Sequence, residues 1–98
     1  MTMYYIYKAI HPDGSVYYGI TSKGIDYAKH QHRLSTYNSG GHTSYTGLSL
    51  YAKKTNTPID KWKFELLHKI YDRDEAFQLK KLYVKTHCDC LNIKYKLS

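Results

Sequence analysis

Tyrosine is concentrated near the start of the chain, in the segments YYIYK (residues 4–8) and SVYYGITSK (residues 15–23). The chain has 12 tyrosines and only two phenylalanines. A phenol hydroxyl forms hydrogen bonds while its ring packs on a sheet, so tyrosine suits a sheet surface that lies against a sugar–phosphate backbone. The phenol is a weak base because its pKa is about 10, but a neighbouring cation or metal-bound water makes the phenolate accessible. The alternative is that these are half-buried strand residues with solvated hydroxyls.

The charge of the chain also points to an anionic partner. Lysine and arginine total 15 against eight acidic residues, which gives a net charge of +7 and a pI of about 9.4. Such a domain most simply binds nucleic acid, and a basic protein without such a partner is the alternative. Arg33 and Arg73 are the two arginines. Because a planar guanidinium binds anions differently from an ammonium, either position is a candidate for a specific contact.

Size, hydropathy and cysteine content exclude several classes of protein. A chain of 98 residues is expected to form a single domain over residues 1–98. No apolar run approaches the ~20 residues of a membrane span, and no signal peptide is evident, so we predict a cytoplasmic protein without membrane contact. One residue separates Cys88 from Cys90, which disfavours a disulfide and fits reduced thiols. HCDC (residues 87–90) is a poor zinc site because it lacks a second ligand pair.

The first two expected strands, residues 4–10 and 16–21, form a hairpin. Residues 12–14 between them, Pro-Asp-Gly, suit a type I turn that is closed by a left-handed glycine. This loop length sets a register in which Tyr5 and Tyr17 point to the same face of the sheet. A four-residue loop would instead put Tyr18, not Tyr17, on the face of Tyr5.

Further elements are predicted from periodicity and turn residues: a helix over 26–37, a helix over 44–54, a strand over 62–71 and a helix over 73–87. Asp26 and Asp72 are the candidate N-caps of the first and last of these helices. On the first helix, Lys29, Arg33 and Tyr37 share one face. For Arg33 the alternatives are a functional contact and a solvated helix face.

One lysine interrupts the inner stripe of the closing helix. Ala76, Leu79 and Tyr83 form this stripe, and Lys80 lies within about 40° of Ala76 and Tyr83 at ~100° per residue. A charge there either snorkels at the edge of the stripe or points into a functional cleft. Periodicity alone favours snorkelling.

Four ordered segments resemble the GIY-YIG nuclease family. They are MYY (residues 3–5) for Gly-Ile-Tyr, YYG (17–19) for Tyr-Ile-Gly, HRLSTY (32–37) for the arginine helix, and residues 61–86 for the third strand and closing helix. The resemblance covers nearly the whole chain. It implies an α/β fold with a small three-stranded antiparallel sheet flanked by helices, and hydrolysis of DNA phosphodiesters with Mg²⁺ or another divalent metal.

The resemblance also assigns roles to individual residues. Tyr5 and Tyr17 take the two motif tyrosines, with Tyr5 as the base and Tyr17 orienting the phosphate. Arg33 contacts a non-bridging phosphate oxygen. Tyr37 takes a position that is often histidine, and His42 takes a histidine of the homing-endonuclease branch. An ordinary loop histidine is the alternative for His42.

The chain departs from the family at the metal site. The family glutamate stands three residues before an aromatic–aliphatic pair, which here is Tyr83-Val84, so Lys80 occupies its position. This alignment favours the alternative in which the Lys80 side chain points into a functional cleft. A carboxylate holds a metal, whereas an ammonium repels it. We therefore predict a DNA endonuclease that is inactive or impaired as written, and a catalytically silent DNA-binding protein of the same fold is the alternative.

The expected partner is DNA, contacted mainly through its phosphates because the charge is lysine-rich. Lys29, Lys53 and Lys54 are the candidate DNA-binding residues outside the motifs. The separate DNA-binding module of homing enzymes in this family is not evident in the sequence. The resemblance therefore leaves open a homodimer or an additional partner that supplies specificity.

Overall fold

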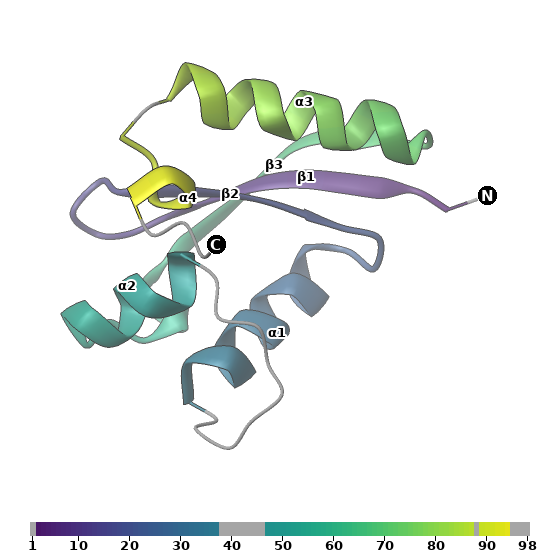
Figure 1. Cartoon of the computed structure of the whole chain (residues 1–98). Helices are drawn as coiled ribbons and strands as arrows, with labels where there is room; N and C mark the ends of the chain where they lie inside the picture. The colour runs from purple at the N-terminus through teal and green to yellow at the C-terminus, as the bar shows by residue number, and fades with distance from the viewer. Residues whose placement is uncertain (1, 38–46, 88, 95–98) are drawn as a thin grey trace.

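The computed structural model of the chain describes residues 2–37, 47–87 and 89–94, leaving aside the side chains of 34–37, 47, 49 and 94. The elements in order are β1 (Tyr4–Ile10), β2 (Val16–Thr21), α1 (Ile25–Tyr37), α2 (Gly47–Thr55), the 3₁₀ helix η1 (Ile59–Lys61), β3 (Lys63–Ile70), α3 (Arg73–Thr86) and α4 (Leu91–Lys94). The strands form one antiparallel sheet in the order β2-β1-β3. Helix α3 lies over one face, and α1 and α2 lie over the other (Figure 1).

This arrangement confirms the predicted α/β fold with its three-stranded antiparallel sheet. The elements η1 and α4 were not predicted, because three or four residues carry too little periodicity to be recognised. Among the described helices, none has the length and hydropathy needed to cross a bilayer.

The β1–β2 hairpin has the register that its turn predicts. The His11 N–H donates to the Ser15 carbonyl at 2.8 Å, and Gly14 closes the loop with a φ of +95°. The ladder continues from this pair until Tyr5 stands opposite Thr21. Odd-numbered residues of both strands therefore share a face, and Tyr5 and Tyr17 lie on the same side of the sheet as expected.

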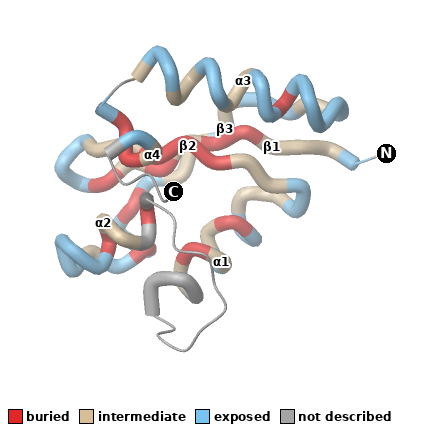
Figure 2. Tube along the Cα trace, viewed as in Figure 1, coloured by how far each residue is buried: buried red, intermediate tan, exposed pale blue. Residues whose placement is uncertain are grey.

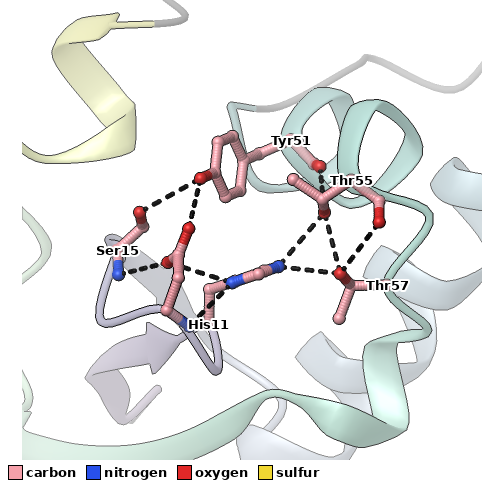
Figure 3. A network of polar contacts seen from close by, with 6 residues as sticks. His11, Ser15, Tyr51, Thr55 and Thr57 are labelled. Atoms are coloured by element: carbon pink, nitrogen blue, oxygen red, sulfur yellow. Dashed lines mark hydrogen bonds and ion pairs between the residues drawn. The ribbon is translucent and has the colours of Figure 1, made fainter.

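A polar network ties the hairpin turn to the end of α2 (Figure 3). Nε2 of the buried His11 lies 3.1 Å from Thr55 Oγ1 and 2.8 Å from Thr57 Oγ1. The Tyr51 hydroxyl donates to the carboxylate of Asp13. The turn that sets the strand register is thus held by side chains that lie more than thirty residues away in the sequence.

The two faces of the sheet are covered to different extents (Figure 2). The main core lies on the side of α1 and α2 and consists of Ala9, Tyr17, Leu48, Ala52, Ile59, Trp62 and Leu91. On the other side α3 buries only Ala76 fully and stacks Tyr83 on Tyr18, with ring centroids 5.5 Å apart. Most of α3 therefore remains accessible to solvent.

Helix boundaries follow the caps, with one correction. The Asp72 side chain accepts hydrogen bonds from two N–H groups of the first turn of α3, which confirms the predicted cap. Asp26 does not cap α1, because the Gly24 carbonyl already accepts the Ala28 N–H at 3.2 Å. Asp26 lies inside the first turn, where its charge still favours the positive end of the helix dipole.

Helix α4 covers part of the free edge of β2. The Asn92 amide donates to the Tyr18 carbonyl at 2.7 Å, and its oxygen accepts the Tyr18 N–H at 2.8 Å. A side chain thereby takes the place of a neighbouring strand. These two bonds fix α4 beside α3 and the sheet edge.

Candidate functional site

A cavity of about 280 Å³ opens where the sheet meets α1 and α3 at the free edge of β2, and we call it the edge cavity. Its lining residues are Tyr7, Tyr17, Ile20 and Thr21 from the strands, Tyr27, Ala28, Gln31 and His32 from α1, and Lys80 from α3. Tyr17 and Lys80, both singled out from the sequence, thus lie in one place.

A buried tyrosine–histidine pair forms the inner part of the edge cavity. The Tyr7 hydroxyl lies 2.7 Å from His32 Nε2, and the two residues are 3% and 6% exposed. Burial, with a smaller contribution from Tyr17, raises the pKa of Tyr7 far above its ordinary value. Burial also lowers the pKa of His32 to about 4. Both groups are therefore neutral at pH 7, and one proton lies between them.

Gly19 explains how Tyr7 reaches this position. The two residues stand opposite each other on β1 and β2. A Cβ atom built on Gly19 would lie 2.2 Å from Cζ of the Tyr7 ring. The ring therefore crosses directly over the glycine backbone, a contact that any larger residue would block. The glycine of the YYG segment has this packing role.

Tyr17 packs against the same histidine. Its ring meets the His32 ring edge-on, with centroids 5.5 Å apart and an interplanar angle of 82°. The Tyr7 and His32 rings are also edge-on, at 6.1 Å. The imidazole is thus held between two phenols, which fixes the geometry of the cavity wall.

Lys80 brings a positive charge to the cavity. It is half-buried, and this burial lowers the pKa of its ammonium. It forms no ion pair or hydrogen bond within the part of the chain that the structure describes. Lys23 Nζ lies 4.9 Å from the ring centroid of Tyr27, which is a lining residue. Of the two alternatives for Lys80, the structure favours the cleft, since Lys80 and Tyr17 line the same cavity.

Of Tyr5, Tyr17 and Arg33, which are predicted to converge on one cleft, only Tyr17 lines the edge cavity. Tyr5 shares the sheet face but stands two positions before Tyr7 on β1. Arg33 donates to Asp60 of η1 in a largely exposed ion pair. Its neighbour His32 takes the inward position, and successive helix residues point about 100° apart.

The remaining candidates lie elsewhere. Lys29 Nζ is 5.8 Å from the Phe64 ring centroid, while Lys53 and Lys54 are exposed in the last turn of α2. None of these three lysines lines the edge cavity. Tyr37 is the last residue of α1, but its side chain lies outside the described residues, as does the whole of His42.

Tyr7 and His32 form the inner pair of the cavity, and the sequence reasoning missed both. A signal for Tyr7 was present, because the hairpin register already places it opposite Gly19. For His32 the signal was its spacing of four residues from Ala28, a small residue that turns the same helix face inward. The sequence-based prediction instead favours the more polar face of the helix, which carries Lys29 and Arg33.

A divalent metal does not fit the edge cavity. Mg²⁺ is held mainly by carboxylates, other oxygen ligands and water, and the described lining contains no carboxylate. Across the described residues, no cluster of three or more His, Cys, Asp or Glu is placed to hold an ion. The Lys80 ammonium would also repel a cation. The lining favours an anion instead.

No protein-family model matches the sequence, and neither a curated protein nor a solved structure matches it. The resemblance to GIY-YIG nucleases therefore stays a prediction. The functional proposal therefore rests on the residues that line the edge cavity.

Proposed function

We propose that this chain binds DNA through the phosphate backbone, with one phosphate held in the edge cavity. The supporting observation is Lys80, which shares the lining of the cavity with tyrosine and threonine residues and with no described carboxylate. Phosphate oxygens accept strong hydrogen bonds from an ammonium and further bonds from hydroxyl groups. The net charge of +7 adds a long-range attraction for a polyanion.

The choice of DNA over other phosphate polymers rests on the resemblance to GIY-YIG nucleases. Lys23 places a second ammonium 4.9 Å from the ring centroid of the lining residue Tyr27. A lining lysine and a second lysine near a lining residue suit a chain of phosphates rather than a single enclosed anion.

A metal-dependent endonuclease of the GIY-YIG type, silent as written, is the second candidate. The observation in its favour is that Lys80, at the position of the family glutamate, shares a cavity with the motif tyrosine Tyr17. Tyr7 rather than Tyr5 lies in this cavity. In this candidate we therefore assign the first motif tyrosine to Tyr7.

DNA binding is tested by fluorescence anisotropy with short duplexes of different sequence. For about four phosphate contacts, affinity should fall on the order of 10²-fold between 50 and 200 mM salt, and it should vary little with sequence. Lys80→Gln should weaken binding about tenfold and reduce the salt slope by about one. Lys61→Gln, an exposed lysine of η1, is the matched control and should change both much less. Salt-independent binding, or no binding at low salt, would sink the proposal.

The second candidate is tested by plasmid nicking with Mg²⁺ or Mn²⁺. The native chain and Lys80→Gln should be inert, whereas Lys80→Glu should nick because it supplies a carboxylate. Adding Tyr17→Phe should remove that activity, while adding Tyr5→Phe should leave it. If Lys80→Glu stays inert though folded and bound to DNA, the endonuclease candidate is wrong. If the native chain nicks and still does so with Tyr17→Phe, the assignment of the cavity is wrong.

A further inference from the structure

A second hollow of about 330 Å³ lies between α3 and α4, and we call it the α3 groove. Its lining residues are Phe77, Lys80, Lys81, Val84, Lys85 and Asn92. Three of them are lysines, and the described lining contains no acidic residue. The volume is at the lower end of the ~300–1,000 Å³ typical of ligand sites. The occupant that this lining favours is therefore anionic.

The groove also offers an aromatic surface. Phe77 is 39% exposed although it is a large apolar side chain on a surface helix. The guanidinium carbon of Arg73 lies 5.4 Å from its ring centroid, so a planar cation already occupies one side of the ring. Phe77 also lines the α3 groove. A flat aromatic group from a ligand can stack there, next to the apolar Val84.

Lysines and an aromatic ring together define the chemistry of the occupant. Lys81 and Lys85 are one helical turn apart, about 6 Å along the axis, so they can each contact one of two successive phosphates. Single-stranded nucleic acid offers both phosphates and unpaired bases, and proteins bind it with basic grooves and stacking rings. In a duplex the base faces are already stacked, which would leave Phe77 unused.

The α3 groove adjoins the edge cavity, because Lys80 lines both hollows. Asn92 keeps the groove wall in place through its two hydrogen bonds to the Tyr18 backbone at the β2 edge. A strand that leaves the edge cavity past Lys80 therefore meets Lys81, Lys85 and Phe77 next.

We infer that the α3 groove binds a single-stranded DNA segment that continues from the DNA held in the edge cavity, with a base stacked on Phe77 and phosphates on Lys81 and Lys85. This inference rests on the proposed function and narrows its ligand. The preferred DNA is a duplex with a single-stranded extension.

The test measures the affinity of the full chain for a blunt duplex, for the same duplex with a thymidine overhang, and for oligothymidylate. The overhang should bind about tenfold more tightly than the blunt duplex, since stacking of one base is worth about that factor. Phe77→Ala should remove this preference and leave blunt-duplex binding unchanged. Phe77→Tyr should keep it. Leu82→Ala, which also shortens an exposed apolar residue of α3, should have no effect.

Failure of the inference is distinguishable from failure of the proposed function. If the blunt duplex binds but the overhang adds nothing, the α3 groove assignment is wrong and the edge cavity proposal stands. An overhang preference that survives Phe77→Ala also overturns the assignment. If none of the three DNA probes binds at low salt, both proposals fail. Poly-glutamate that competes as well as oligothymidylate, independently of Phe77, would identify an acidic protein surface as the partner instead.

Discussion

Two polar clusters in this small fold are built from similar residues and differ in one respect. The turn cluster at the β1–β2 hairpin consists of His11, Asp13, Ser15, Tyr51, Thr55 and Thr57. The edge cavity likewise joins tyrosine, threonine and histidine side chains, but it has Lys80 where the turn cluster has Asp13. The first cluster contains its own anion, whereas the described part of the second contains only a cation.

This difference distinguishes a structural cluster from the site that we propose for binding. In the turn cluster, the Tyr51 hydroxyl, followed by the Ser15 backbone N–H and His11, lowers the pKa of the Asp13 carboxyl, so the negative charge is stabilised by the protein itself. In the edge cavity, Tyr7 and His32 satisfy each other without charge, and Lys80 has no described anionic neighbour. An unpaired, half-buried charge favours a ligand of opposite sign.

The glycines of the two regions give the largest expected contrast. Gly19→Ala would place a Cβ atom 2.2 Å from the Tyr7 ring, which must then leave His32. We expect a loss of unfolding free energy of about 3 kcal/mol, at the upper end of overpacking costs. Gly14→Ala meets no atom within 4 Å but keeps a φ of +95°, so it should cost about 1 kcal/mol through backbone strain. Urea unfolding measures both, and equal losses would contradict this account of Gly19.

The next contrast is the dependence of stability on pH. His32 has a folded-state pKa of about 4, against an ordinary histidine pKa of 6.5, because burial disfavours its charged form. The unfolded state therefore takes up a proton first as the pH falls. The contribution of His32 to stability is complete above pH 6.5 and should be lost between pH 6.5 and 4, by about 2–3 kcal/mol at 1.36 kcal/mol per pKa unit.

The check is the change of unfolding free energy across this pH window. His32→Gln should lower stability at pH 7 yet remove most of the loss between pH 6.5 and 4. His30→Gln, an exposed histidine of the same helix, is the matched control and should retain the loss. A native-like pH profile in His32→Gln would show that the buried pair is not the titrating group.

The hairpin and the strand register could be predicted because they depend on local chemistry. Residues 12–14 specify the turn, and the turn specifies which residues face each other. Lys80 was found for a similar reason, since a charge in an apolar helix stripe is visible in the sequence. Both features depend only on residues that are close together in the sequence.

The rest depends on contacts between distant segments. Which face of α1 turns inward is decided by Tyr7 and Tyr17 packing on His32, not by the helix itself. Helix α4 is positioned by Asn92, which bonds to Tyr18 seventy-four residues away in the chain. Periodicity within one segment carries no information on such partners.

A smaller pH effect is expected from the turn cluster, with a different window. The pKa of Asp13 is lowered in the folded state, chiefly by the Tyr51 hydroxyl. Its contribution is therefore present above the unfolded pKa of about 4 and is lost as the pH falls further. The carboxyl is largely exposed, so the effect should stay below about 1 kcal/mol. Asp13→Asn should remove this acid-limb loss and keep the His32 step; if the His32 step disappears as well, the two clusters are not independent.

The smallest effect is expected at Arg33, where the resemblance and the geometry make opposite predictions. If Arg33 had the role that the resemblance implies, it would contact phosphate, and Arg33→Ala would weaken DNA binding as much as Lys80→Gln. In the structure its guanidinium pairs with Asp60 at the surface, outside the edge cavity. We therefore expect Arg33→Ala to cost less than about 1 kcal/mol of stability and to change DNA affinity less than Lys80→Gln.

Asp60→Ala and the double variant complete a cycle in which the stability losses are not additive, because both single changes remove the same ion pair. If Arg33→Ala reduces DNA affinity as strongly as Lys80→Gln, the arginine leaves Asp60 when DNA binds, and the edge cavity is only part of the phosphate site.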